Sequence, residues 1–372
     1  MRLTEWKKML AIETFLDEVI QLVDNDLFIE NDNKIRNGIL LLAILNDIKF
    51  MEQLNLRKIL VNARNLYSGC SIFTGYAQLG LIILNLKQSQ ISIKQKDALI
   101  KQINRILEDY IDDIYLDINK FEYLELINGL VGVGRYLLNF SDIESQSYVK
   151  KILKIIYNLC FQRKILYRKN NNLKYYDLGM SHGISGVLAF ISICKIHGVD
   201  IKQSNMMILH LYKFIDSYKY NYRETYLWPC KINLNNKNIK KNKYPLSWCY
   251  GTSGINIALY LASKALGDTF NMEFVANNMK TSIESFKYEE MFDETILCHG
   301  YVGLLLILKI FYHYTHDDYF KNKYFDLKKY LHKLSKYDLD NYYDILEGNM
   351  IYELIERRNI NIQIIEEMLM LS

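Results

Sequence analysis

Two short glycine-containing segments, residues 247–254 and 297–303, hold the side chains best suited to do chemistry. The first contributes Cys249, and the second contributes Cys298 and His299. Thiolate sulfur and neutral imidazole nitrogen are ligands that zinc prefers, and three protein ligands leave the fourth tetrahedral position for water or substrate. These residues therefore indicate an open zinc site. The alternative is two buried cysteines and a histidine that forms a structural hydrogen bond.

The same backbone pattern recurs along the chain, which favours a shared site over a chance pairing of thiols. Residues 127–132 and 181–186 also contain Gly-x-x-Gly, and degenerate copies occur at residues 74–75 and 346–348. The leading glycines, spaced 54, 54, 68, 49 and 48 residues apart, are Gly75, Gly129, Gly183, Gly251, Gly300 and Gly348. A period in this range marks a repeat architecture. Each motif opens an apolar run, so we expect each at the N-terminal end of a helix, with successive ends converging on one point.

Three of these segments, in their order along the chain, resemble the signature motifs of the lanthionine synthetase C-like family, the lanthipeptide cyclases. They are residues 176–183 (Tyr-Asp-Leu-Gly-Met-Ser-His-Gly), 248–251 (Trp-Cys-Tyr-Gly) and 298–300 (Cys-His-Gly). The resemblance covers roughly residues 70–372, and it is specific because three separated motifs stand in register. It implies an all-α fold, an α/α toroid of about seven inner and seven outer helices.

The resemblance also implies an activity and a ligand set. Zinc would be bound by Cys249, Cys298 and His299. The enzyme would add cysteine thiols of a dehydrated precursor peptide to dehydroalanine or dehydrobutyrine, forming lanthionine or methyllanthionine rings. Zinc coordination deprotonates a thiol whose free pKa is ~8.5, and conjugate addition then produces an enolate that must take a proton. We expect a cyclase that acts alone, because 372 residues leave no room for a dehydratase.

His182 is the candidate acid for that proton transfer. Imidazole can hold or give a proton near neutral pH, and the Gly-x-x-Gly context of His182 predicts a place on the same rim as the zinc ligands. In the family a histidine at this motif position is functional. The alternative is a structural hydrogen bond to the backbone.

Two positions depart from the family pattern. The family usually has an aspartate four residues before the second repeat's glycine, and this chain has Glu125 there. The carboxylate is kept, one methylene longer, so Glu125 is a candidate orienter or proton acceptor. The family often has an arginine four residues before the first zinc cysteine, and this chain has Pro245. Lys243 could supply a positive charge, but lysine is not a geometric substitute for arginine.

The resemblance implies partners and a location. The partners are the precursor peptide with its leader, a dehydratase, and an export transporter at the inner face of the membrane, so the location is cytoplasmic. The departures at Glu125 and Pro245 favour one alternative of another class, a non-catalytic zinc-bearing adaptor that binds peptide on the same fold. A toroidal glycan hydrolase or lyase is disfavoured, because it would use carboxylate pairs and aromatic platforms.

Composition is consistent with one cytoplasmic globular unit over residues 1–372. The chain is 50% hydrophobic and 24% charged, an ordinary globular balance. A net charge of +4 is too mild to indicate a nucleic-acid partner. The six cysteines show no disulfide framework, and the N-terminus shows no secretory pattern. No apolar run approaches the ~18 residues of a membrane span.

Apolar spacing predicts helices in two layers. Residues 96–117 and 146–160 have one apolar face and are outer-layer candidates, whereas the motif-led runs are apolar nearly all round and are inner-layer candidates. The run after Gly38 is the candidate for the seventh inner helix. Residues 219–247 interrupt the period, and we interpret them as an insertion on the rim. This insertion is either a solvated loop or a basic, aromatic lip that contacts a peptide.

A second group of metal-ligating side chains follows the last motif-led run. His313, His316 and Asp317 could mimic a metal cluster, but they lie beyond a helix and have no glycine motif. We therefore do not predict a second metal site.

Overall fold

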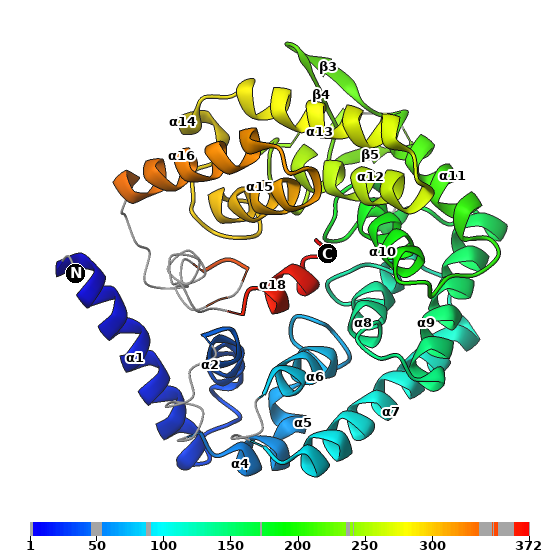
Figure 1. The fold of residues 1–372 in the computed structure, drawn as a ribbon. Coiled ribbons are helices and arrows are strands. Elements are labelled where there is room, and N and C mark those ends of the chain that lie inside the picture. Colours follow the sequence, from blue (N-terminus) through cyan, green and yellow to red (C-terminus); the bar gives the residue numbers. More distant parts are fainter. Residues whose placement is uncertain are drawn as a thin grey trace.

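Helices close into a ring with an inner and an outer layer (Figure 1). The computed structural model describes residues 3–45, 54–86, 91–171, 173–235, 239–240, 242–334, 344, 346–348 and 361–371. The inner layer contains α2 (Asp32–Leu45), α6 (Tyr76–Asn85), α8 (Leu130–Leu137), α10 (Ile184–Ile196), α12 (Thr252–Leu266) and α15 (Tyr301–Thr315). The outer layer contains α1 (Leu3–Asp24), α7 (Ile93–Asp117), α9 (Ile143–Ile156), α11 (Ser204–Asp216), α13 (Thr269–Glu284) and α16 (Asp318–Leu334). The expected α/α toroid is confirmed.

The two layers differ in burial as their sequences predict. All residues of α10 from Ile184 to Cys194 are buried, because this helix is covered on both sides. In α7 burial follows one stripe, which includes Ile103, Leu107 and Ile111, and the rest of the helix carries charged side chains. A helix with one apolar stripe suits the outer layer. The run after Gly38 is the buried part of α2, an inner helix, as expected.

Within the described residues, a motif glycine ends a loop and caps the inner helix that follows at Gly75, Gly129, Gly183, Gly251 and Gly300. Gly251 precedes α12 with extended backbone, φ −91° and ψ 173°. Glycine is needed at this position because the backbone of the loop comes very close: a Cβ there would lie 2.4 Å from the amide nitrogen of Ser247. At Gly254 a Cβ would lie 2.0 Å from the carbonyl oxygen of Trp248. The loops before the inner helices are therefore folded tightly against the helices that they precede.

Hydrogen bonds join these loops into a continuous rim at one end of the ring. The bonds run from one repeat to the next, and in each of them a loop donates to the carbonyl oxygen of a neighbouring loop. They are Ser71 Oγ to Ile127, Leu126 N to Ser181, Met180 N to Cys249, Cys249 N to Cys298, and Cys298 N to Leu346, with distances of 2.7, 3.2, 2.7, 3.2 and 2.9 Å. The motif ends therefore converge, as the repeat predicts. Residues 349–360, directly after the last motif glycine, lie outside the described part of the chain.

A small antiparallel sheet stands at this rim and was not predicted. Its strands, in the order β1-β2-β5-β6, are Arg168–Asn170, Leu173–Asp177, Lys231–Asn233 and Ile239–Lys240. A separate hairpin pairs β3 (Tyr220–Tyr222) with β4 (Thr225–Leu227). The segment 219–247 is thus not simply a solvated loop. Trp228 is buried, and its Nε1 donates to the carbonyl oxygen of Ile215 at 3.0 Å.

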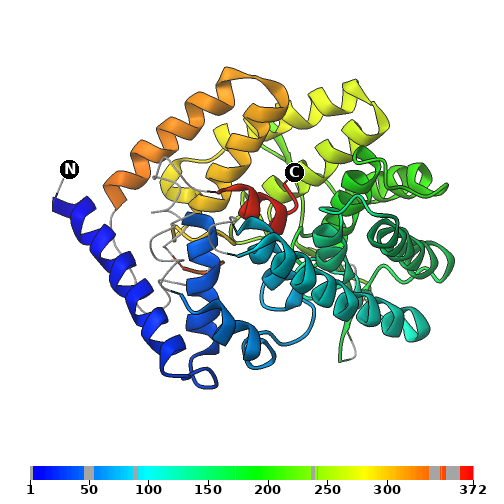
Figure 2. The ribbon, with the colours of Figure 1, turned by 60° about the horizontal axis from the view of Figure 1, so that its bottom comes forward.

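The C-terminal helix α18 (Gln363–Met368) lies inside the ring, surrounded by inner helices (Figures 1 and 2). Its Glu367 accepts a hydrogen bond from Asn139 Nδ2 at 3.1 Å, and its Oε1 lies 4.0 Å from Arg135 Nη2. Trp248 Nε1 donates to the carbonyl oxygen of Leu369 at 3.0 Å. This segment therefore ties α8 to the loop that precedes α12.

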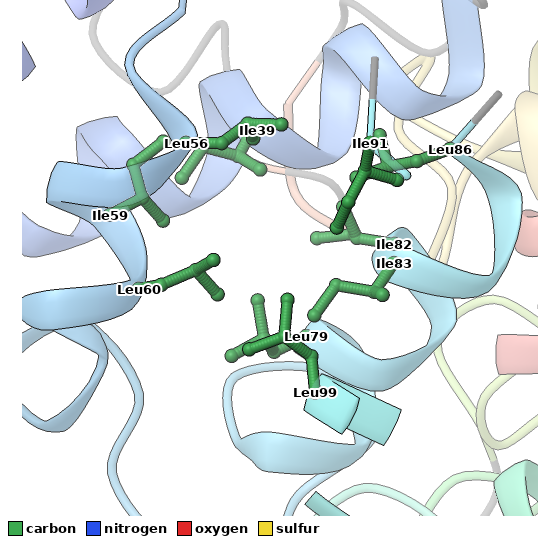
Figure 3. Close-up of a pocket in the computed structure, with 10 residues that line it drawn as sticks. All are labelled: Ile39, Leu56, Ile59, Leu60, Leu79, Ile82, Ile83, Leu86, Ile91 and Leu99. Atoms are coloured by element: carbon green, nitrogen blue, oxygen red, sulfur yellow. The ribbon is translucent and has the colours of Figure 1, made fainter. Parts of the chain in front are cut away.

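Short elements complete the described chain: α4 (Leu56–Val61), α5 (Ala63–Leu66), α14 (Tyr288–Met291), a 3₁₀ turn at Phe121–Tyr123 and a π-helical turn at Tyr157–Gln162. Aliphatic side chains, most of them from α2, α4 and α6, line a cavity of about 10 Å³. Figure 3 shows these side chains around it. That volume is at the lower limit for one water molecule, so this region is packed core. Among the described helices, none is long and apolar enough to cross a membrane.

Candidate metal centre

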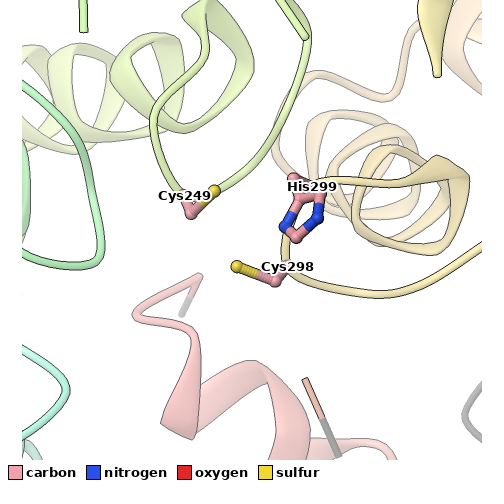
Figure 4. A group of neighbouring side chains, drawn as sticks. All are labelled: Cys249, Cys298 and His299. Atoms are coloured by element: carbon pink, nitrogen blue, oxygen red, sulfur yellow. The ribbon is translucent and has the colours of Figure 1, made fainter. Parts of the chain in front are cut away.

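Cys249, Cys298 and His299 meet at the rim (Figure 4). Their sulfur and nitrogen atoms all lie within 4.8 Å of one another. Cys249 comes from the loop before α12, and the other two come from the loop before α15. The loops are joined by the bond from Cys249 N to the carbonyl oxygen of Cys298. The fold thus brings together all three ligands that the sequence predicts.

The side chains of this cluster polarise one another. A hydrogen bond from Cys298, helped by His299, lowers the pKa of Cys249 to about 6, although burial opposes the shift. The same hydrogen bond and burial raise the pKa of Cys298. The bond to Cys249 raises the pKa of His299. The hydrogen bonds of the cluster therefore favour the thiolate form of Cys249.

The donor set fits zinc. Two sulfur atoms and one imidazole nitrogen are borderline-soft ligands, and such a set with one open position is typical of catalytic zinc sites. The loop-to-loop hydrogen bond holds the backbones of both cysteines together. Elsewhere in the described ranges no other metal-ligand group of this kind is found. His316 ends α15 and Asp317 pairs with Lys280, so they do not form a second cluster with His313.

His182 and Glu125 form a pair on the same rim. His182 Nδ1 lies 2.5 Å from Glu125 Oε2, and the Glu125 side chain is only 4% exposed. Glu125 also accepts hydrogen bonds from the amide nitrogens of Ile127 at 3.0 Å and Asn128 at 2.7 Å. Its longer side chain is thus fixed by its own loop. The His182 side chain is 30% exposed, so its ring can meet a solvent-borne ligand.

The segment before His182, residues 179–181, directly contacts the loop that carries Cys249. The amide nitrogen of Met180 donates to the carbonyl oxygen of Cys249 at 2.7 Å, and the amide nitrogen of Ser181 donates to the same atom at 3.3 Å. A Cβ at Gly179 would lie 2.5 Å from that oxygen. The position of His182 is therefore coupled to that of Cys249 through three consecutive residues.

Sequence reasoning missed three side chains at this rim. The ring of Tyr250 lies 6.2 Å from that of His182, and its position directly after Cys249 was a usable signal. Arg168 Nη1 donates to the carbonyl oxygen of His182 at 3.2 Å. Arg168 lies on β1, which the sequence analysis did not predict. Tyr244 stacks on His299 with ring centroids 5.6 Å apart.

Lys243 does not replace an arginine at position 245. Its Nζ donates to Asp293 Oδ2 at 2.8 Å and to Tyr244 Oη at 2.7 Å, and its side chain is 72% exposed. The carbonyl oxygen of Pro245 accepts a hydrogen bond from Thr252 N at 2.7 Å. Pro245 therefore accepts a hydrogen bond from the first residue of α12, and the charge of Lys243 is paired with Asp293 at the surface.

Comparisons with known proteins agree with this architecture. A family model described as lanthionine synthetase C-like protein matches residues 45–353. The nisin biosynthesis protein NisC of Lactococcus lactis subsp. lactis is 25% identical over 265 residues, which cover 65% of this chain and 62% of that protein. The lacticin 481/lactococcin biosynthesis protein LcnDR2 of the same organism is 26% identical over 349 residues, covering 87% of this chain and 33% of that protein.

A solved structure of nisin cyclase superposes with a TM-score of 0.82 and covers 97% of this chain and 98% of that one. The identity is 19%, so this likeness establishes the fold. The chain spans less than two thirds of the length of either curated relative.

Proposed function

We propose, from the premise that the chain belongs to the lanthionine synthetase C-like family, that it is a zinc-dependent lanthipeptide cyclase. Its substrate would be a dehydrated precursor peptide, and its product a lanthionine or methyllanthionine thioether. The observation that carries the proposal is the convergence of Cys249, Cys298 and His299 beside the pair of His182 and Glu125. The first three can hold a metal, and the other two can move a proton.

The metal residues prepare the nucleophile. Cys249, Cys298 and His299 would hold zinc, which when bound would accept the substrate thiol and keep it as a thiolate near neutral pH. The pKa of Cys249 is already lowered to about 6 by its hydrogen bond with Cys298. A ligand that is easily deprotonated favours metal binding at neutral pH.

His182 and Glu125 handle the proton. A new bond joins the substrate sulfur to Cβ of the dehydrated residue, and the π electron pair moves onto the neighbouring carbonyl oxygen. Glu125 holds Nδ1 of His182, so the other ring nitrogen faces the substrate and delivers a proton to Cα. The carbonyl then re-forms, and His182 regains a proton from the solvent. Glu125 orients the imidazole and stabilises its protonated form, a common role for a carboxylate beside a catalytic histidine.

The proposed partners derive from the proposed reaction. They are a precursor peptide with its leader, a dehydratase that supplies the alkenes, and an export transporter, which together imply a cytoplasmic location at the inner face of the membrane. We further propose that residues 1–372 act as one toroid unit, with residues 219–247 as a rim insertion that contacts the peptide. In support, β5 of this insertion pairs with β2, which leads into the His182 loop.

Two measurements on the purified protein test the proposal. One is zinc content, and the other is loss of free thiols from a dehydrated precursor. A catalyst has one zinc per chain and consumes thiols. A non-catalytic peptide-binding adaptor, which Glu125 and Pro245 favour as departures from the family pattern, holds zinc and binds peptide but consumes no thiols.

A further inference from the structure

One face of the small sheet is turned toward the site. The strand register places Arg168 opposite Tyr175, and Asp177 opposite Lys231. Side chains alternate between the two faces of a sheet, and directly opposed residues share a face. Arg168, Tyr175, Asp177 and Lys231 therefore project together. Tyr176 projects the other way, where its ring packs edge-on against Phe214 with centroids 4.9 Å apart.

This face carries two cations to the residues around the metal cluster. Arg168 Nη1 donates to the carbonyl oxygen of His182 at 3.2 Å. Lys231 Nζ lies 5.4 Å from the ring centroid of Tyr250 and 5.0 Å from that of Tyr175. Tyr250 directly follows Cys249, and its ring lies 6.2 Å from that of His182. Lys231 is thus held by two rings, and one of them, Tyr250, lies next to Cys249 in the chain and near His182.

Two acids, Glu122 and Asp177, lie near the cations of this face. Within the described ranges Lys231 forms no ion pair, and the Nε of Arg168 lies 3.8 Å from Glu122 Oε1, beyond hydrogen-bond distance. Asp177 is fully buried, and its Oδ2 accepts no hydrogen bond from a described residue. Burial raises the pKa of Asp177, and the nearby charges of Lys231 and Arg168 oppose that rise. This face therefore carries two cations, Arg168 and Lys231, around one buried carboxyl group, that of Asp177.

Conjugate addition needs such a charge. As the S–Cβ bond forms, the electron pair of the alkene moves onto the carbonyl oxygen of the dehydrated residue. A donor fixed beside that oxygen stabilises the charge where it develops, and this is usually a large term in catalysis. Pro245 offers neither an N–H group nor a charge, and Lys243 is paired with Asp293 at the surface. Lys231, beside the ring of Tyr250, is a cation that could take this place.

We propose that Lys231 donates a hydrogen bond to the developing enolate oxygen, and that Arg168 positions His182 for the proton transfer. This inference rests on the proposed cyclase function. Lys231 keeps its proton throughout: the negative charge rises on the oxygen as the S–Cβ bond forms and disappears when His182 protonates Cα. Lys231 is therefore a catalytic residue of the reaction, and Arg168 acts through the His182 carbonyl.

The sheet supplies a matched control for the charge. Lys174 lies on β2, the strand that pairs with β5. It is opposite Lys169 and projects to the other face, where its Nζ lies 4.7 Å from the ring centroid of Tyr167. Lys231→Gln and Lys174→Gln each remove one positive charge from the sheet. If the charge acts at long range, both variants should lose rate. If Lys231 contacts the substrate, only Lys231→Gln should lose rate.

The experiment measures kcat and KM with a synthetic peptide that carries one cysteine and one dehydroalanine. We expect Lys231→Gln to lower kcat by roughly 10²-fold, the usual effect of removing one oxyanion donor, with KM and zinc content unchanged. Lys231→Arg should regain part of kcat, and Lys174→Gln should match the wild type. Arg168→Gln should lower kcat at unchanged KM, and Arg168→Lys should recover part of it.

Three results distinguish the possible failures. If Lys231→Gln turns over as fast as Lys174→Gln, or changes KM alone, Lys231 does not stabilise the enolate. If Lys231→Gln unfolds, Lys231→Met keeps the aliphatic stem over both tyrosine rings and repeats the test without charge. If the wild type with full zinc does not cyclise this peptide or a dehydrated precursor, the proposed function fails, and this inference fails with it.

Discussion

His182 Nδ1 lies 2.5 Å from Glu125 Oε2, although the two residues belong to different repeats and are 57 positions apart. The bond from Leu126 N to the carbonyl oxygen of Ser181 fixes the two loops beside this contact. Glu125 is further held by two backbone amides. The imidazole is therefore oriented by a carboxylate that cannot easily turn away.

Replacing either member of this pair should reduce catalysis without loss of metal. We expect His182→Ala to keep one zinc per chain and a near-native melting temperature, because His182 does not belong to the cluster around Cys249. The rate of thioether formation should fall by ~10²–10⁴-fold, the usual cost of losing a general acid. The rate of Glu125→Gln should fall less than that of His182→Ala, because the imidazole remains. Steady-state cyclisation assays at matched zinc content check this. Loss of zinc from His182→Ala would identify His182 as a ligand.

Zinc content should depend on the three clustered residues and not on the other cysteines. We expect about one zinc per chain in the wild type, and strong loss in Cys298→Ala and His299→Ala, because two protein ligands hold zinc weakly. Cys70→Ala is the control, since Cys70 is a buried cysteine outside the cluster. Elemental analysis after dialysis measures this. Equal zinc in Cys298→Ala and Cys70→Ala would remove Cys298 from the site.

In the metal-free protein one thiol should ionise well below the ordinary range. The hydrogen bond from Cys298 lowers the pKa of Cys249 to about 6, so Cys249 is mostly thiolate at pH 7 and is protonated as the pH falls through about 6. Ultraviolet thiolate absorbance, followed against pH after chelation of metal, measures this. Cys249→Ala should lack that transition. An unchanged transition in Cys249→Ala would assign it to another thiol.

Helix α18, inside the ring, should contribute to stability through the buried pair of Glu367 and Arg135. Arg135 is 4% exposed, and burial lowers its pKa while Glu367 opposes that shift. Breaking a buried pair on one side typically costs ~3–5 kcal/mol. We therefore expect Glu367→Ala to lower the unfolding free energy by roughly that amount, and Arg135→Met combined with Glu367→Leu to recover much of it. Denaturant unfolding checks both. A loss in the double variant equal to that of Glu367→Ala would show that the uncompensated charge is not the cause.

The toroid, and the convergence of Cys249, Cys298 and His299, were predictable from the sequence for a physical reason. Each motif loop packs so tightly on its helix that a Cβ at Gly251 or Gly254 would overlap backbone atoms, so the glycines recur wherever the loop does. Burial of inner helices on both sides leaves a second signal, as in α10. Loop ends that repeat this geometry must gather at one rim, and this brings Cys249 and Cys298 together.

The sheet was not predictable in the same way. Its strands have two to five residues, and β2 and β5 are separated by α10 and α11 in the chain. No alternating pattern can specify such pairing, because the register depends on contacts made after the helices pack. Arg168 and Lys231 could therefore not be placed beside His182 and Tyr250 from the sequence. The sequence predicted roles in proton transfer for His182 and for Glu125. It did not predict that their side chains meet at 2.5 Å.

The central claim is that this rim forms thioethers, and counting free thiols in a dehydrated precursor peptide tests it most directly. Cyclisation leaves the mass of the peptide unchanged but consumes thiols, so alkylation followed by mass measurement reports the reaction. We expect wild-type protein with one zinc per chain to remove alkylatable thiols, and His182→Ala with the same zinc to leave most of them over the same time. If the wild type with full zinc leaves every thiol free, the protein is not a cyclase of that peptide and the adaptor function is favoured.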